Sequence, residues 1–286
     1  MIDITYDRVE KFGKSIIQHG KYNDRAYLMK LHPNDEETII DQIDYLVNKY
    51  SYTKVFAKIP SDFDYLFFNH GYKKEAKITG LYNGEANASF MGKFFSNARA
   101  SHKNRDKKII TEIFALAKSK QFNSKISDTP DGFTVQELNK SDAIELSELY
   151  KKVFRTYPFP IHDPEYISKT MDENIIYFGF FNNGNLIAAS SSEIDINDQS
   201  AEMTDFATHH DFRGFGLALI LLDKMENRMK EIGIKNCYTI ARALSFGMNI
   251  TFSKKGYNYS GTLVNNTNIS GKIESMNVWY KLIVGF

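Results

Sequence analysis

The sequence contains a single cysteine among its 286 residues. Cys237 cannot form a disulfide within the chain, which favours a reducing compartment and a cytoplasmic location. It lies in the apolar run CYTIA, so we expect a buried structural thiol and not a nucleophile. No cluster of His, Cys, Asp or Glu has the spacing of a metal site, and no metal is expected.

The chain also has little net charge and no long apolar run. It has 36 Lys and Arg against 35 Asp and Glu, and a formal net charge of +1 argues against nucleic acid as a partner. No apolar run approaches about 18 residues, and the N-terminus lacks an apolar signal core, so neither a membrane partner nor export is expected. With 42% apolar residues the composition is that of a globular protein whose partner is selected by a pocket.

The order of predicted elements indicates an α/β (α+β) fold with a mixed sheet. The polar stretch 121–132 is the most linker-like segment, and we expect an N-terminal unit, 1–125, and a second unit, 132–283. In the second unit Asn183-Gly184 predicts a tight hairpin between strands 175–181 and 186–194. The pattern then predicts a strand, a helix, a strand and a shorter helix, at about 201–209, 214–232, 237–241 and 245–255.

The first unit shows a similar order of elements. A shift of 185 residues places HGY at 70–72 on KGY at 255–257, and helix 36–50 on 221–235. Few residues are identical, so only the order of elements supports a repeat. Upstream of the first helix, YLMKLHPNDEE contains no glycine. We therefore expect a degenerate partial copy that binds no phosphate, extends the sheet and shields the pocket.

The segment HHDFRGFGLALILLDKM, 209–225, places a glycine loop between a strand and a helix. Free N–H groups at a helix start bind anions, and Gly214 and Gly216 allow close approach of a ligand. Arg213 can add charge-assisted hydrogen bonds to a phosphate. The segment lacks the third glycine of a dinucleotide fingerprint and the Gly-Lys-Ser/Thr of a P-loop. These two phosphate-binding patterns are therefore excluded.

In this context, DFATHHDFRGFGLALILLDKM resembles the pyrophosphate-binding segment of the GNAT superfamily of N-acetyltransferases. Its motif Q/R-x-x-G-x-G/A matches Arg213, Gly216 and Ala218, and NITFSKKGY at 249–257 is similar to the later helix that ends in Gly and an aromatic. The resemblance implies a GNAT-type splayed mixed sheet flanked by helices, with acetyl-CoA as cofactor along 202–208. The implied cofactor contacts are Phe206, Ala207, Thr208, Arg213, Gly214, Phe215, Gly216, Leu217, Ala218, Asn249 and Phe252.

Longer segments resemble the β-lysine N-acetyltransferase family over nearly the whole chain. They include IQHGKYNDRAYLMKL at 17–31, YPFPIHDPEYI at 157–167 and GTLVNNTNISGKIESMNVWYK at 261–281. The resemblance implies acetylation of the 6-amino group of β-lysine (3,6-diaminohexanoate), with lysine 2,3-aminomutase supplying the substrate and the compatible solute Nε-acetyl-β-lysine as product. Another small diamine, an aminoglycoside, or a CoA-binding sensor without turnover are the alternatives. The oligomeric state stays open, a homodimer included.

Amine acetylation asks for a base, an oxyanion donor and an acid. Deprotonating a lysine-type ammonium of pKa about 10.4 costs about 4.6 kcal/mol at pH 7. Glu202 and Asp205 are the candidate bases; strand alternation predicts that at most one faces the substrate, and we favour Glu202. A backbone N–H of the splayed strand would stabilise the oxyanion. Phe252 fills the slot in which many GNAT members carry tyrosine, which leaves Tyr257, another pocket tyrosine or water as the acid.

A pocket for β-lysine should contain charges of both signs. Candidate partners for the carboxylate are Arg242 and Arg155. Candidate partners for the 3-ammonium are Glu193, Asp195 and Glu274. We expect 155–166 to form a loop that caps the substrate, lined by Tyr157 and Phe159.

Overall fold

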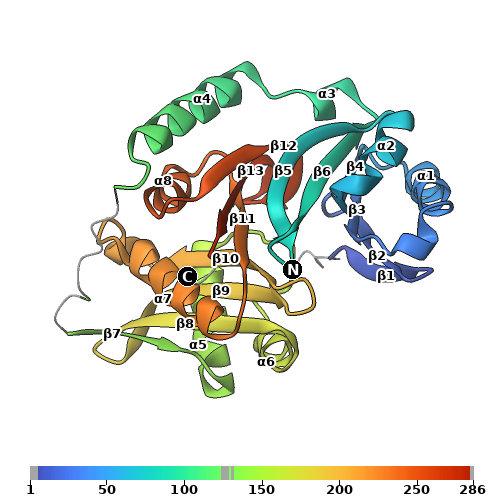
Figure 1. Cartoon of the computed structure of the whole chain (residues 1–286). Helices are drawn as coiled ribbons and strands as arrows, with labels where there is room; N and C mark the ends of the chain where they lie inside the picture. The colour runs from blue at the N-terminus through green and yellow to red at the C-terminus, as the bar shows by residue number, and fades with distance from the viewer. Residues whose placement is uncertain (1–5, 124–128, 130–131, 284–286) are drawn as a thin grey trace.

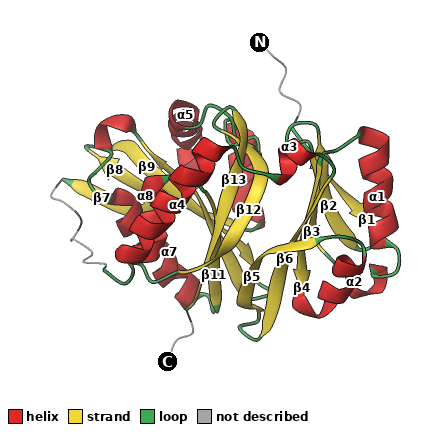
Figure 2. Cartoon of the chain, turned by 90° about the horizontal axis from the view of Figure 1, so that it is seen from above, coloured by secondary structure: helices red, strands yellow, loops and turns green. Residues whose placement is uncertain are grey.

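The computed structural model describes residues 6–123, 129 and 132–283, whose strands form two mixed sheets (Figures 1 and 2). The first sheet has six strands in the order β1-β2-β3-β4-β6-β5. The second has seven, in the order β12-β13-β11-β10-β9-β8-β7. Helices flank both sheets, so the predicted α/β class with mixed, helix-flanked sheets is confirmed.

The N-terminal sheet encloses a core of its own on one face. Helix α1 buries Ile39, Ile43 and Val47 against this face, and as a crossover it makes β3 and β4 parallel. The elements of this unit are β1 (Arg8–Phe12), β2 (Ser15–Gly20), β3 (Arg25–Lys30), α1 (Ile39–Tyr50), β4 (Lys54–Pro60), α2 (Asp64–Asn69), β5 (Lys73–Tyr82), β6 (Ala86–Phe94), α3 (Asn97–Ala100) and α4 (Asn104–Ser119).

The second sheet lies between α5 on one face and α7 on the other (Figure 2). The hairpin predicted at Asn183-Gly184 joins β8 to β9, with φ of +48° and +79° at the two positions. The elements here are β7 (Phe133–Glu137), α5 (Ala143–Val153), α6 (Pro164–Glu173), β8 (Ile175–Asn182), β9 (Asn185–Asp195), β10 (Ser200–Thr208), α7 (Leu217–Glu231), β11 (Asn236–Arg242), α8 (Phe246–Lys254), β12 (Asn258–Ile269) and β13 (Lys272–Leu282).

The sheet opens between its two central parallel strands. β10 pairs with β11 only over Ser200–Glu202, opposite Asn236–Tyr238, and the strands then separate. Because the remaining residues of β10 have no partner on this side, their backbone groups and side chains border an opening in the sheet. This splay is the feature that positions the site.

Apart from β7, the two sheets share one topology. Three antiparallel strands (β1–β3 or β8–β10) lead through a helix to a parallel strand, and a second helix then leads to a hairpin. The register of β5 against β6 shifts after Lys74 and Ile78, and that of β12 against β13 shifts after Tyr259 and Leu263. Each pair of shifts is separated by 185 residues. The first helix departs from this offset, because the left-handed residues that end α1 and α7, Ser51 and Gly233, are 182 apart. The predicted common order of elements is therefore observed.

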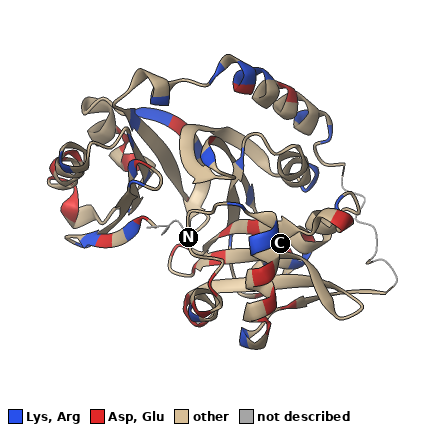
Figure 3. Cartoon of the chain, turned by 180° about the vertical axis from the view of Figure 1, so that it is seen from behind, with Lys and Arg blue, Asp and Glu red and all other residues tan. Residues whose placement is uncertain are grey.

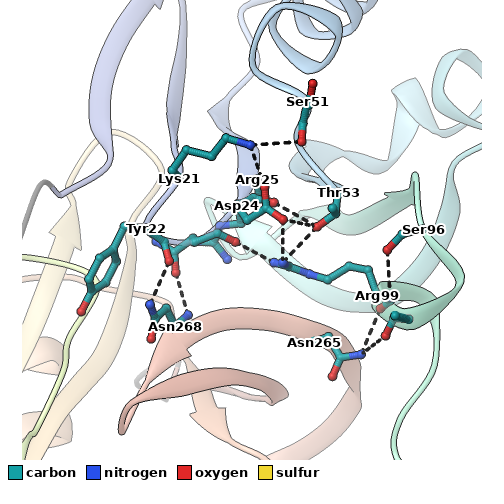
Figure 4. Close-up of polar contacts among 12 residues, drawn as sticks. Lys21, Tyr22, Asp24, Arg25, Ser51, Thr53, Ser96, Arg99, Asn265 and Asn268 are labelled. Carbon is teal, nitrogen blue, oxygen red and sulfur yellow. Dashed lines mark hydrogen bonds and ion pairs between the residues drawn. The ribbon is translucent and has the colours of Figure 1, made fainter.

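Buried polar contacts join the N-terminal unit to β12 (Figure 4). The Arg99 guanidinium donates to the carbonyl of Asn23 at 2.7 Å, and the Asn265 side chain donates to the carbonyl of Arg99 at 3.0 Å. Arg25 Nη1 donates to the carbonyl of Asn266 at 2.7 Å. Hydrogen bonds removed from water are costly to break, so these contacts hold β3 in a defined position against β12.

Two predictions about single features can be compared directly with the structure. Cys237 is fully buried in the core beneath α7, and burial raises the pKa of its thiol, which confirms the predicted buried thiol. In the described ranges no helix has the length and apolar character that crossing a membrane requires. Residues of both charge signs occur in both units (Figure 3).

Candidate active site

A cavity of about 840 Å³ lies where β10 and β11 separate. Its lining runs from the loop before α7, along β10 and β11, to the inner face of the N-terminal sheet. This volume is within the range of about 300–1,000 Å³ typical of small-molecule and cofactor sites. Both units of the chain therefore contribute walls to one pocket.

The glycine loop forms one end of the cavity. Gly214 and Gly216 have φ of +90° and +76°, a region that side chains disfavour, and a Cβ at either position would meet no atom within 4 Å. Among described residues, none accepts a hydrogen bond from the backbone N–H groups of 214–218. These donors at the start of α7 fit an anion such as a pyrophosphate.

The predicted cofactor contacts divide into pocket residues and others. The cavity is lined by Phe206, Thr208, Arg213, Gly214, Gly216, Leu217, Ala218 and Phe252. Phe215 is exposed and Ala207 is buried, and neither lines the cavity. Asn249 is also outside the lining; its Oδ1 accepts from Asn277 Nδ2 at 2.8 Å and from Trp279 Nε1 at 3.0 Å. Its side chain holds α8 against β13, so the structure does not place it with the predicted cofactor contacts that line the cavity.

Glu202 and Asp205 both face the pocket, which corrects the prediction that at most one would do so. The register of β10 against β9 shifts between Thr204 and Ala207, and Asp205 has φ of +55°. Such a bulge adds a residue to one strand and interrupts its alternation. As a result Asp205 lies on the same side of β10 as Glu202.

Glu202 is a half-buried carboxylate with a raised pKa. Burial raises the pKa to about 8, and the negative charge of Glu193 contributes in the same direction. The Lys58 ammonium and the Tyr238 hydroxyl oppose the shift. A carboxylate with a pKa near the working pH is well matched to accept a proton from an ammonium.

Asp205 differs from Glu202 because hydroxyl groups hold both of its oxygens. The Tyr157 hydroxyl donates to Oδ1, and the Ser191 hydroxyl donates to Oδ2 at 2.5 Å. Burial raises the pKa of Asp205, and these hydrogen bonds oppose the increase. Tyr157 lines the pocket as predicted, whereas Ser191 lies in the uniform run SSS and carried no signal in the sequence.

Tyr257 is not placed to act as an acid in the cavity. Its side chain is fully buried in the core beneath α7, outside the pocket lining. The Gly-aromatic pair turns the Tyr257 ring into the core, so the structure does not bring Tyr257 to the predicted site. Tyr238 does line the pocket, and its hydroxyl accepts from Lys58 Nζ at 3.3 Å.

Only some of the predicted substrate contacts line the cavity. Phe159, Glu193 and Arg242 line the cavity, but Glu274 does not. Arg242 donates to both oxygens of Glu274, at 3.0 Å each, and the Glu274 side chain is 1% exposed. Arg242 and Glu274 were predicted to bind opposite ends of the substrate, but in the structure they pair with each other. Of the further candidates, neither Asp195, which forms an ion pair with Lys30 at 2.9 Å, nor Arg155 lines the cavity.

One wall of the pocket was missed altogether by sequence reasoning. Alternate residues of three N-terminal strands face the cavity, namely Gln18, Arg25, Tyr27, Met29, Phe56 and Lys58. Their period of two is typical of strands, but nothing local indicates which face meets a partner sheet. The only signal was the family-like segment 17–31, which contains the first four of them.

The splayed sheet, the glycine loop and the acidic pocket define an acetyltransferase of the GNAT class. The Acetyltransferase (GNAT) family matches residues 144–246. The chain is 44% identical, over 96% of its length and 99% of the relative, to a β-lysine N(6)-acetyltransferase of Methanococcus maripaludis. The chain belongs to the β-lysine N(6)-acetyltransferase family.

Two further relatives agree with this membership. The chain is 37% identical to N-acetyltransferase YodP of Bacillus subtilis, over 76% of this chain and 75% of that protein. It is 34% identical to a β-lysine N(6)-acetyltransferase of Methanosarcina mazei, over 65% of this chain and 67% of that protein. The chain is thus an acetyl-transferring enzyme.

Proposed function

We propose that the chain transfers the acetyl group of acetyl-CoA to the 6-amino group of β-lysine. The observation that carries this proposal is one cavity with an anion-binding loop at one end and three carboxylates in its walls, the half-buried Glu193 and Glu202 and the buried Asp205. A diamino acid brings two ammonium groups, which such a pocket can neutralise. The names of two relatives support this substrate over other amines.

Acetyl-CoA supplies the activated thioester, and the residues of the loop suit its pyrophosphate. The N–H groups of 214–218 and the Arg213 guanidinium would hold that group, because glycines keep the backbone accessible. The unpaired N–H groups of β10 beyond Glu202 are available to a developing oxyanion.

Glu202 accepts the proton that the 6-ammonium must lose. The amine nitrogen would then bond to the acetyl carbon of bound acetyl-CoA while the carbon–sulfur bond breaks. The second proton of the nitrogen would pass to the departing sulfur, so that CoA leaves as the free thiol. Asp205 holds the amine through a fixed negative charge, since its own oxygens are already engaged by Tyr157 and Ser191. Tyr238 is a second pocket tyrosine, beside Tyr157, and its hydroxyl lies within reach of Lys58 and Glu202.

Purified protein incubated with acetyl-CoA and β-lysine is expected to release free thiol, measured with a thiol reagent, and to form Nε-acetyl-β-lysine, identified by mass spectrometry. Lysine, a polyamine and an aminoglycoside serve as comparison substrates. Far better turnover of any of these would reject β-lysine while leaving the acetyltransferase class intact. Tight CoA binding in calorimetry without transfer to any amine would instead indicate a sensor.

Replacing Asp205 by asparagine is expected to raise KM for the amine by about 10- to 100-fold, because one neutralising charge is removed from the site. CoA affinity, measured by calorimetry, should change little. Ser191→Ala keeps the carboxylate and removes one hydrogen bond, so its effect on KM should be smaller. An Asp205→Asn enzyme with unaltered KM would contradict the proposed role of the charge.

The same proposal places the enzyme after an aminomutase that converts lysine to β-lysine, with the product acting as a compatible solute in the cytoplasm. We also propose that 1–125 and 132–283 are two related units, of which only the second binds CoA. The corresponding loop in the first unit supports this division, since Asp35 there is buried and accepts from Ser15 Oγ at 2.7 Å. A carboxylate at this position disfavours a phosphate.

A further inference from the structure

Arg25 is a buried cation that forms no ion pair with a carboxylate of the described residues. Its side chain lines the cavity and the residue is 4% exposed. Nη1 donates to the carbonyl of Asn266 at 2.7 Å and to Thr267 Oγ1 at 3.2 Å, while Nε has no hydrogen-bond partner among described residues. The guanidinium also lies over the rings of Tyr27 and Phe56, 5.2 and 5.7 Å from their centroids. Rings compensate a buried charge only in part.

Two other buried cations of the N-terminal unit, Lys54 and Arg99, each lie near a carboxylate of the chain. Lys54 pairs with Glu75 at 2.8 Å, and Arg99 lies 3.7 Å from Asp24. Neither of them lines the cavity. Arg25 is thus distinguished by facing the pocket and by lacking a carboxylate in the described part of the chain. Burial lowers its pKa to about 10, so it remains charged near neutral pH.

Gln18 adds a second unused donor at the same place. It is 1% exposed, lines the cavity, and its Nε2 has no hydrogen-bond partner among the described residues. Gln18 is paired with Tyr27 across β2 and β3, so Gln18 and Arg25 are diagonal neighbours on one face of the sheet. An amide and a guanidinium side by side, with unsatisfied N–H groups, fit a carboxylate.

The opposite wall carries the complementary charges. Glu193, Glu202 and Asp205 belong to β9 and β10 of the second sheet, and the Tyr27 ring is close enough to both Arg25 and Glu202 to be influenced by their charges. The cavity therefore has a cationic end formed by the N-terminal unit and an acidic wall formed by the second unit, 132–283. A molecule with ammonium groups and one carboxylate matches both.

We propose that Arg25 and Gln18 of the N-terminal unit bind the carboxylate of the substrate, and that this contact makes the enzyme select an amino acid over a simple diamine. The inference rests on the proposed function for the identity of the amine. It assigns a role to the N-terminal unit, which supplies the end of the pocket that distinguishes substrates.

The test compares β-lysine with 1,4-diaminopentane, which has the same two amines and carbon spacing but no carboxylate. Wild-type enzyme is expected to favour β-lysine in kcat/KM by a factor on the order of 10² to 10³. Arg25→Met should remove most of that preference by lowering kcat/KM for β-lysine alone. Gln18→Glu should act in the same way, because the new carboxylate occupies the Arg25 donors and repels that of the substrate. This second variant keeps the buried charge paired and so protects the fold.

Calorimetry with CoA and the thermal midpoint report whether each variant retains its fold and its cofactor site. Lys58→Met is the matched control, because Lys58 also lines the pocket but acts on Glu202 through its charge. It should change both substrates by a similar factor. A selective loss of β-lysine in Lys58→Met, with none in the Arg25 and Gln18 variants, would assign the carboxylate to Lys58 and overturn the inference.

The two proposals fail in different ways. If wild-type enzyme acetylates neither β-lysine nor the diamine, the proposed function is wrong. If it acetylates β-lysine and the Arg25→Met and Gln18→Glu enzymes do so equally well while folded, the proposed function holds and the carboxylate site is wrong.

Discussion

Replacing Glu202 by glutamine is expected to lower kcat for amine acetylation by about 10²- to 10⁴-fold, the usual contribution of a positioned general base. Only the ionised carboxylate accepts a proton, so the wild-type rate should rise as the pH passes through the Glu202 pKa of about 8. This limb should disappear from the pH profile of the variant. The measurement is steady-state kinetics between about pH 6 and 10, carried out with two amine substrates that the enzyme turns over at different rates.

Glu193→Gln is the matched control for Glu202→Gln. Glu193 lines the same cavity, and its charge raises the pKa of Glu202. Removing that charge should move the rising limb to lower pH while leaving most of kcat. A Glu202→Gln enzyme that keeps both its kcat and the limb would exclude Glu202 as the base.

The raised pKa of Glu202 also predicts that the stability of the protein depends on pH. The folded-state pKa of about 8 lies above the ordinary glutamate value of 4.5, so the protonated carboxyl stabilises the fold at low pH. That stabilisation is lost as the pH rises from about 4.5 through 8, where the half-buried carboxyl group of Glu202 must ionise. The thermal midpoint of Glu202→Gln relative to wild type should therefore increase between pH 5 and 9.

Replacing Gly216 by leucine should weaken CoA binding by about 100-fold or more. The position has φ of +76° and begins α7, and a side chain there would enter the space from which the N–H groups reach a pyrophosphate. Losing two hydrogen bonds to a charged group accounts for a change of this size. Isothermal titration with CoA gives the affinity.

Gly233→Leu separates backbone strain from loss of the site. Gly233 follows α7 with φ of +81°, and a Cβ there also meets nothing within 4 Å, but it is outside the cavity. Both substitutions carry the cost of a left-handed residue. Normal CoA affinity in Gly216→Leu, or an equal loss in Gly233→Leu, would reject the assignment of the phosphate loop.

The glycine loop could be predicted because its conformation is local. Gly214 and Gly216 follow a strand and begin a helix, and a few consecutive residues determine that the N–H groups point outward. The same holds for the hairpin at Asn183-Gly184. Such features depend on backbone conformations that particular residue types favour.

The acidic wall could be predicted only in part. Glu202 and Asp205 were named from their strand, but alternation misplaced Asp205, because a bulge depends on how β10 pairs with β9. Tyr257 was misplaced for a related reason. The sequence does not indicate whether the aromatic side chain beside this glycine points into the core or toward the cavity. In the structure, Tyr257 packs into the core beneath α7.

By itself, the sequence determined the order of elements, the GNAT class and the glycine loop, because all of these depend on residues near one another in the chain. Only the tertiary structure decided that Glu202 and Asp205 share a face, that Arg242 is paired with Glu274, and that Arg25 reaches the same cavity. Arg25 and Asp205 come from different sheets, and β12 holds Arg25 in place through Asn266. Contacts between such distant segments are set by how the two sheets pack, which no local pattern encodes.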